Sequence, residues 1–245
     1  MKREKYNITM WYDEAYSYDD IIRILRKEKR RKKIIAIAVC LVVVVACITA
    51  SLLIRYDELV RNYCELELST DKASYSVTKY EGSDTQVIIP TVYRKKPITN
   101  IGYGAFSGNE TVTYVTIPNT VVSIGEYAFS NCTSLVGIGI PDTVVSIGDY
   151  TFSGCTSLTD IVISNSVTDI GDYAFANCTS IIRIRLPNTI TNIGSAVFDG
   201  CKSFFEITFE GTQEEWYAIT KADDWDAGIG FYVVYCEDVT IFISD

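Results

Sequence analysis

Residues 135–157 read LVGIGIPDTVVSIGDYTFSGCTS, and this stretch decides the fold because its pattern recurs every 23 residues. The recurrence is clearest at five phenylalanines, each five positions after an Ile-Gly pair: Phe106, Phe129, Phe152, Phe175 and Phe198. A fixed period of roughly 20 to 50 residues is typical of a solenoid, whose units bury their apolar faces against one another. Such architectures present surface to partners, so the period favours a binding protein.

Within one unit, the apolar residues recur at spacings that predict a short strand followed by turns. Leu135, Ile138 and Ile140 follow an L-x-x-I-x-I spacing, whose last two members alternate as in a strand with one buried face. Pro141 ends this strand because it lacks the N–H that a ladder needs. Gly148 is expected to adopt a backbone conformation closed to other residues. The other inward positions are Val144, Ile147, Phe152, Cys155 and Leu158.

Stacked coils of this kind predict a parallel solenoid with a strand on one face and turns or short helical segments on the other. Cysteines keep the same step, at Cys132, Cys155, Cys178 and Cys201. The first full repeat has Asn109 in this place, and no pair shows the C-x2-C spacing of zinc sites. Because a buried cysteine behaves as a small hydrophobe, we interpret the four as packing residues and predict no metal and no cofactor.

The pattern L-x-x-I-x-I-P-x-x-V-x-x-I-G-x-x-x-F-x-x-C resembles the BspA-type leucine-rich repeat of bacterial surface proteins. The resemblance covers residues 75–245, including N-terminal capping strands over 75–90 and an exit at 209–212 followed by Glu215-Trp216. Ser164 replaces one proline, and a five-residue insertion lies around 93–97. The resemblance implies an α/β leucine-rich-repeat solenoid with parallel strands on its concave face. It also implies a surface-exposed adhesion or protein-interaction module.

The C-terminal end reads as a cap for this solenoid. Thr212-x-x-Glu215 matches a capping box, so a short helix should begin at Thr212 and bury Trp216 and Ile219. Residues 231–235 and 239–243 alternate as a closing hairpin. Terminal repeats are atypical because they shield the column from water.

Residues 34–54 predict one transmembrane helix, since these 21 positions carry no charge. Their helical length of roughly 31 Å would cross a bilayer core of about 30 Å. The preceding RKEKRRKK (26–33) is strongly basic, which places residues 1–33 in the cytoplasm and the repeats outside the cell. Val44-Val45-Ala46-Cys47 loosely resembles a lipoprotein cleavage box, so a processed signal is the alternative to an uncleaved signal-anchor.

Charge divides sharply across this segment. Residues 1–33 hold 11 basic and 6 acidic side chains, whereas residues 55–245 hold 11 basic and 25 acidic ones. An acidic ectodomain argues against nucleic acid, whose phosphates need a basic footprint. The basic tail is expected to set topology and to contact anionic lipid headgroups. A docking site for a cytoplasmic partner is the alternative use of the tail.

Residues 55–71 are predicted to form a juxtamembrane stalk ahead of the ectodomain at 72–245. Leu52, Tyr56, Leu59, Tyr63 and Leu66 recur at spacings of 4, 3, 4 and 3. This seam lasts only two heptads, so it fits either a dimeric coiled coil or a lone amphipathic helix packed on the N-terminal cap. The coiled coil would make the protein a self-associating scaffold, which is our alternative to a binding function.

No catalytic system is expected. The chain has no histidine, which removes Ser-His-Asp and Cys-His nucleophiles and the usual zinc ligand sets. Asp223, Asp224 and Asp226 surround Trp225, yet nothing places a second carboxylate opposite them as a glycosidase needs. We interpret this stretch as a solvated turn in which Trp225 covers the open end of the core.

Candidate ligand-binding residues point outward from the predicted strands. One column contains Tyr114, Gly137, Asp160, Arg183 and Glu206, and the next contains Thr116, Gly139, Val162, Arg185 and Thr208. The alternating signs of Asp160, Arg183 and Glu206 fit a cross-strand ion ladder. The functional reading is that Arg183 and Arg185 anchor an acidic ligand. A further column of Tyr127, Tyr150 and Tyr173 fits either an interface or a cover for the turns.

Overall fold

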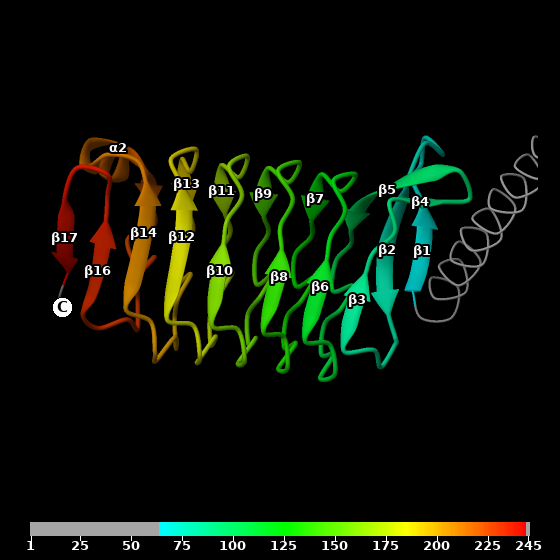
Figure 1. The fold of residues 1–245 in the computed structure, drawn as a ribbon, viewed down its shortest axis with the longest axis horizontal. Coiled ribbons are helices and arrows are strands. Elements are labelled where there is room, and N and C mark those ends of the chain that lie inside the picture. Colours follow the sequence, from blue (N-terminus) through cyan, green and yellow to red (C-terminus); the bar gives the residue numbers. More distant parts are fainter. Residues whose placement is uncertain (1–63, 244–245) are drawn as a thin grey trace, which may run out of the picture. The chain divides into compact units, whose positions relative to one another are not determined.

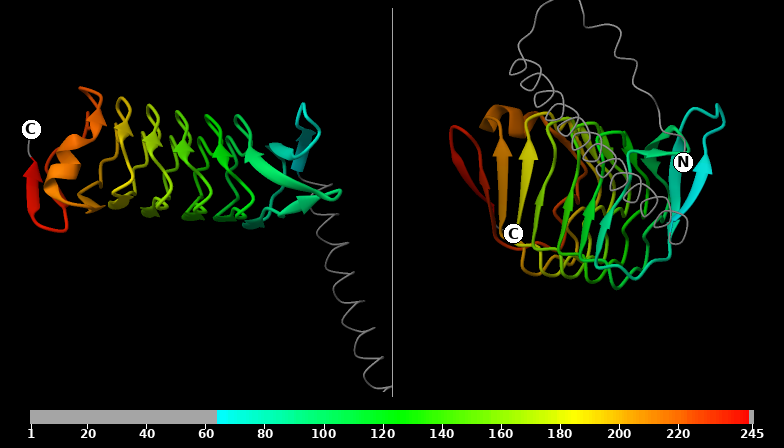
Figure 2. Two further views of the ribbon diagram at one scale, coloured as in Figure 1. Left: turned by 90° about the horizontal axis from the view of Figure 1, so that it is seen from above. Right: turned by 45° about the vertical axis from the view of Figure 1, so that its right-hand side comes forward.

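Each 23-residue unit winds once around an apolar column, and the turns stack into the β-solenoid of Figures 1 and 2. The computed structural model describes residues 64–243. The predicted tail, membrane segment and most of the stalk lie outside these residues. Within 64–243, no helix combines the length and apolar character needed to cross a membrane.

Parallel strands stack on two sides of the column. The strands nearest the viewer in Figure 1 are β3 (Gln86–Ile88), β6 (Tyr114–Thr116), β8 (Gly137–Gly139), β10 (Asp160–Val162), β12 (Arg183–Pro187), β14 (Glu206–Glu210), β16 (Tyr232–Tyr235) and β17 (Thr240–Ile243). Their outward surface is called the front face below. The second sheet contains β1 (Cys64–Leu68), β2 (Tyr75–Tyr80), β5 (Lys96–Ile101), β7 (Ser123–Ile124), β9 (Ser146–Ile147), β11 (Asp169–Ile170), β13 (Asn192–Ile193) and β15 (Thr220–Lys221), with β4 (Val92–Tyr93) paired to β5.

The second sheet corrects the predicted fold class. Turns or short helical segments were expected opposite the front strands. Turns are present, for example over 149–154, but most repeats also carry a two-residue parallel strand, such as Ser146–Ile147. In the part of the chain that the structure describes, the α-helix is α2 (Gln213–Ala218) of the C-terminal cap. The α/β assignment was therefore wrong in its helical part, and the domain is a parallel β-solenoid.

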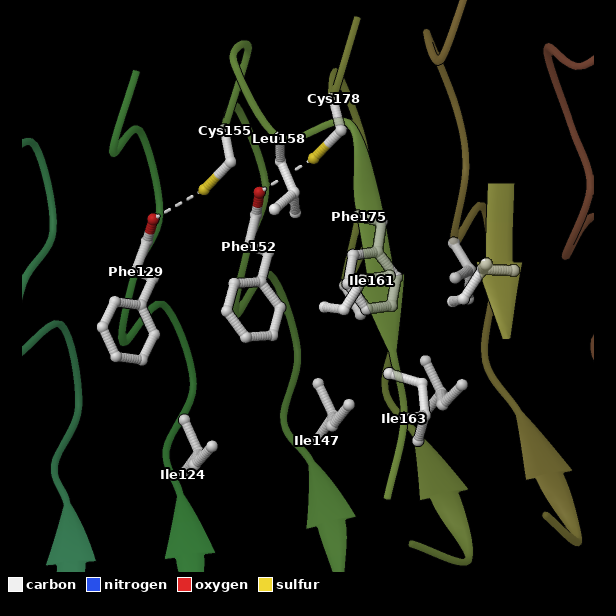
Figure 3. Close-up of a cluster of buried hydrophobic side chains, with 14 of the residues drawn as sticks. Ile124, Phe129, Ile147, Phe152, Cys155, Leu158, Ile161, Ile163, Phe175 and Cys178 are labelled. Atoms are coloured by element: carbon white, nitrogen blue, oxygen red, sulfur yellow. Dashed lines mark hydrogen bonds between the residues drawn. The ribbon is translucent and has the colours of Figure 1, made fainter. Parts of the chain in front are cut away.

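The core is the predicted column, seen in close-up in Figure 3. The phenylalanines at the 23-residue step stack ring on ring, with centroids 4.9 to 5.9 Å apart. Phe152, Cys155 and Leu158 are completely buried. Ile138 and Ile140 are an exception, because they are only half-buried although they point inward. Ser164, in the place of a proline, is buried and donates to the Pro141 carbonyl at 3.2 Å.

The Ile-Gly glycines have a different role from the predicted one. Gly148 is not among the positive-φ residues, so no special backbone conformation requires it. Instead, a Cβ at Gly148 would lie 3.0 Å from the Glu126 nitrogen of the preceding coil. At Gly171 the corresponding backbone distances fall to 2.7 Å and 2.8 Å. These glycines therefore let successive coils approach closely at the second sheet.

Both ends of the column are capped. At the N-terminal end, β1 pairs antiparallel with β2, and the inserted residues form the β4–β5 hairpin through Arg94 and Lys95. Leu66, the last position of the predicted helical seam, lies in β1, so the helix prediction is wrong there. The other seam positions lie outside the described residues.

The structure confirms the C-terminal cap that the sequence predicts. Thr212 and Glu215 form the predicted capping box of α2, which buries Trp216. Trp225 is buried edge-on against both Phe198 and Trp216. The predicted hairpin is present as antiparallel β16 and β17.

Candidate binding surface

The front face brings the predicted columns together in register. Asp160 pairs with Arg183 and Arg183 with Glu206 across β10, β12 and β14, while Tyr114 pairs with Gly137 across β6 and β8. Arg185 lies between Val162 and Thr208 in the neighbouring column. The 23-residue spacing thus predicted the cross-strand register of these residues correctly.

The charges on this face are only partly arranged as the predicted ion ladder. The Arg183 Nε lies 2.5 Å from an Asp160 carboxylate oxygen, and the Arg185 guanidinium lies 3.5 Å from Glu210. Glu206 accepts a hydrogen bond from the Thr208 hydroxyl at 3.1 Å. The arginine side chains remain 60% and 56% exposed, so these pairs contribute at most about 1 kcal/mol each.

A discontinuity separates Tyr114 from the other candidate residues. Strands β3, β6 and β8 form one sheet and β10 to β17 another, with no ladder between β8 and β10. Strand β8 carries Gly137 and Gly139, which contribute no side chains to the front face. A Cβ at Gly137 would lie 3.1 Å from the Tyr114 ring, whereas a Cβ at Gly139 would meet nothing within 4 Å. The Tyr114 ring therefore leans over Gly137 of β8, and β8 and β10 lie between Tyr114 and the arginines of β12 (Figure 1).

Sequence reasoning missed an aromatic cluster at the C-terminal end of the front face. Phe205, Phe231 and Phe242 are 45%, 51% and 69% exposed. The ring centroid of Phe231 lies 6.0 Å from Phe205 and 6.3 Å from Phe242. The sequence contained one indication of this cluster. Phe205 follows Phe204, which points inward, and directly precedes strand β14, so an outward direction of its side chain could have been predicted. Phe231 and Phe242 belong to the irregular cap, where the repeat gives no register.

The tyrosine column lies along the turns, apart from the front face. Tyr127, Tyr150 and Tyr173 adopt positive φ angles of 54° to 57°. Their rings stack with centroids 4.7 and 4.8 Å apart and nearly parallel planes. Because each ring covers the face of the next, the half-buried column offers edges and hydroxyl groups to solvent. This arrangement fits a cover for the turns.

The ladder cysteines have hydrogen-bond partners. Each Sγ–H donates to the carbonyl of the preceding coil's phenylalanine, for example from Cys155 to Phe129 at 3.2 Å and from Cys178 to Phe152 at 3.1 Å (Figure 3). Burial raises the pKa of the Cys132 thiol to about 12. The Cys132 thiol therefore stays protonated at neutral pH and is a poor nucleophile and a poor metal ligand.

Other candidate chemical groups are also held in structural contacts. The Asp224 carboxylate accepts from Ser195 at 2.7 Å, and Asp226 accepts from the Tyr232 hydroxyl at 2.7 Å. Burial lowers the pKa of Lys221 to about 8, and its amino group donates to the Trp216 and Ile219 carbonyls. Across residues 64–243, no three acidic or thiol side chains converge on a possible metal position.

Known proteins share this architecture. Residues 96–218 match, in six copies, a family model described as a BspA type leucine-rich repeat region. A crystal structure of a leucine-rich repeat protein from T. pallidum is similar with a TM-score of 0.58 and 31% identity, over 60% of this chain and 68% of that chain. A leucine-rich cell surface protein from Faecalibacterium prausnitzii is similar with a TM-score of 0.60 and 31% identity, over 64% of this chain and 40% of that chain. None of the curated proteins compared with the chain matches it.

Proposed function

The chain belongs to the BspA-type leucine-rich repeat family, and on this premise we propose that it is a cell-surface protein-binding module. Repeat proteins of this kind are generally non-catalytic scaffolds, which favours a binding role. The description of the Faecalibacterium prausnitzii protein as a cell surface protein supports an extracellular role. Adhesion to a host or neighbouring-cell protein is the specific form of binding that we propose.

The observation that carries this proposal is the composition of the front face toward its C-terminal end. Two exposed arginines, Arg183 and Arg185, lie on β12, and the exposed Phe205 lies at the start of β14 beside it. Arginine and phenylalanine are both enriched at protein interfaces, and arginine is also enriched among the residues that contribute most to binding. The exposed ion pairs with Asp160 and Glu210 contribute little to stability, so they can exchange for pairs with a partner.

A membrane anchor completes the proposal. Residues 34–54 would span the bilayer once, with the basic tail in the cytoplasm near anionic lipid and the solenoid outside the cell. Protease treatment of intact cells should then release a fragment that starts near residue 64, where β1 begins. A solenoid that is cut only after lysis would contradict this orientation.

Charge reversal on the front face tests the binding function. Purified extracellular-matrix, mucin and cell-surface proteins should be screened with the full chain in mild detergent. Any protein captured by the wild type should bind about tenfold more weakly to Arg183→Glu/Arg185→Glu. Lys79→Glu/Lys95→Glu is the matched control, since both lysines are exposed near the N-terminal cap. Equal loss in both variants would indicate a general charge effect and contradict the site.

A homodimer through the stalk is the alternative function. It predicts that the full chain forms dimers in detergent while binding none of the screened proteins. Analytical ultracentrifugation of the full chain and of a chain lacking residues 1–63 separates the two proposals. A monomeric full chain that captures a partner supports the binding function.

A further inference from the structure

The C-terminal end of the front sheet has an open backbone edge. Strand β17 is the last of its sheet, and no strand within residues 64–243 pairs with its outer side. The Cys236 N–H donates to the Val239 carbonyl at 2.9 Å, which makes this a hydrogen-bonded pair of the hairpin. Since such pairs alternate along an antiparallel ladder, the pairs at Thr240 and Phe242 are not hydrogen-bonded. The N–H and C=O groups of these two residues therefore face the open side.

This edge lacks the protection found at the opposite end of the domain. The N-terminal edge strand β1 carries two exposed glutamates, Glu65 and Glu67, and has a bulge between Glu65 and Leu66. Charged side chains and bulges are common devices against unwanted strand pairing. Strand β17 reads Thr-Ile-Phe-Ile, has no charge or proline, and pairs with β16 in unbroken register. The β1 edge of the second sheet is thus protected, whereas the β17 edge of the front sheet has neither device.

The side chains beside the open edge favour an apolar strand. Phe242 lies on β17 itself and is 69% exposed, and Phe231 stacks beside it with an angle of 22° between the rings. Ile241 and Ile243 on the other side of β17 are half-buried against the core. A strand added here would place alternate side chains against the phenylalanines and beside these isoleucines.

The charge of the residues around β17 indicates what kind of segment would bind there. Residues 222–243 contain no lysine or arginine but five carboxylates. Two of them, Glu237 and Asp238, are exposed in the turn at one end of β17. A segment passing this turn would meet negative charge, so lysine or arginine beside its apolar residues would be favoured.

We propose that β17 binds an extended segment of another protein as an added β-strand, and that this segment combines apolar residues with flanking lysine or arginine. The inference rests on the proposed protein-binding function and names its mode and partner chemistry. Backbone hydrogen bonds to Thr240 and Phe242 provide affinity, and the phenylalanines select the side chains.

Synthetic peptides test the strand addition directly. The probe is Lys-Val-Thr-Val-Thr-Val-Lys, compared with a version N-methylated at alternate residues and one with glutamate in place of lysine. Binding to the full chain in mild detergent is measured by fluorescence anisotropy. We expect saturable binding of the first peptide and about tenfold weaker binding of the other two. No saturable binding, or equal binding of the N-methylated peptide, would overturn the proposal.

Variants of the protein locate the site. Thr240→Pro removes one open-side N–H and leaves the hydrogen-bonded pairs of the hairpin intact, and Phe242→Ser removes the apolar contact. Both should weaken peptide binding about tenfold while the melting temperature stays within a few degrees. Tyr103→Ser is the matched control, because Tyr103 is 70% exposed and Phe242 is 69% exposed. Equal weakening by Tyr103→Ser would contradict a site on β17.

Two further outcomes separate this inference from the proposed function. Capture of a partner that is lost in Arg183→Glu/Arg185→Glu and retained in Thr240→Pro would preserve the binding function and overturn the role of β17. A wild-type dimer that Thr240→Pro converts to monomers would identify a second copy of the chain as the occupant. That result would also overturn the proposal.

Discussion

The cysteine column shows how one residue type satisfies both packing and hydrogen bonding. Each thiol fills space among the phenylalanines, and its S–H donates to a carbonyl of the preceding coil. From the sequence alone we would expect Cys155→Ser to cost more than Cys155→Ala, because a hydroxyl would lack a partner in an apolar column. The structure contradicts that reason, since the Phe129 carbonyl lies 3.2 Å from the sulfur.

The contact between Cys155 and the Phe129 carbonyl predicts how substitutions of Cys155 change the free energy of unfolding. Cys155→Ala removes the hydrogen bond and leaves a small void, so it should lower the free energy of unfolding by about 1 to 2 kcal/mol. Cys155→Ser keeps a donor for the carbonyl and should cost no more than the alanine variant. Urea unfolding measures both. A serine variant less stable than the alanine variant by about 1 kcal/mol would show that the carbonyl is out of reach of the hydroxyl.

A second prediction for single residues concerns the glycines at which successive coils meet. Gly171→Ala should destabilise by about 1 to 3 kcal/mol, because its Cβ would meet backbone atoms of the preceding coil at 2.7 and 2.8 Å. Gly139→Ala is the control, since its Cβ would meet nothing within 4 Å. The control should be neutral or stabilising by up to about 1 kcal/mol. Thermal melts in which both variants behave alike would contradict the close-approach explanation.

Residue spacing predicted the inward positions well, since Leu135, Val144, Ile147, Phe152 and Leu158 are all buried. It was less successful where burial depends on a neighbouring coil. Ile138 and Ile140 are half-buried beside the break between β8 and β10, and no pattern within their own repeat indicates that break. The outward columns were also predicted, but only coordinates could show that Arg185 is paired with Glu210.

At the scale of elements, short strands were the hardest to predict. A two-residue strand such as Ser146–Ile147 is too short for any alternation, and it exists because its neighbours in adjacent coils are in register. The five-residue insertion was visible in the sequence as a break in the period. Its structure as the β4–β5 hairpin was not, because Arg94-Lys95 is not a usual turn sequence.

The turn of this hairpin supports a prediction of its own. Arg94 and Lys95 have φ angles of 47° and 65°, and positive φ at both central residues is typical of a type I′ turn. Side chains larger than asparagine are strained in this region by roughly 1 kcal/mol each. Arg94-Lys95→Asn-Gly should therefore stabilise the chain by about 1 to 2 kcal/mol in urea unfolding. Lys79→Asn, a charge change in strand β2, should have little effect by comparison.

At the scale of the whole molecule, the buried thiols should make the fold sensitive to alkali. Burial raises the pKa of Cys132 from 9.0 to about 12, so between these values the folded chain binds more protons than the unfolded chain. The stability that the neutral Cys132 thiol contributes is thus fully present below pH 9 and is lost as the pH rises toward 12. In Cys132→Ala this decline should be shallower by up to about 1.4 kcal/mol per pH unit. Parallel stability curves for the variant and wild type would contradict a buried, neutral thiol.

Removal of one complete coil tests whether the 23-residue period organises the entire domain. Deletion of 135–157 joins Ser134 to Leu158 and keeps every column in phase, so Phe129 would stack on Phe175. The shortened chain should unfold cooperatively, with its urea m-value reduced by about an eighth because less surface is buried. It should also retain partner capture, since Arg183, Arg185 and the aromatic cluster are unchanged.

Deletion of 136–159 is the control for phase. It removes one more residue and joins Leu135 to Asp160, so the L-x-x-I spacing that directs both side chains inward is lost. We expect it to be less stable than the in-phase deletion by several kcal/mol, the scale of a disrupted core position. Equal stability of the two deletions in urea would mean that the coils adjust independently of their period. The stacked columns would then be a consequence of the fold and not its cause.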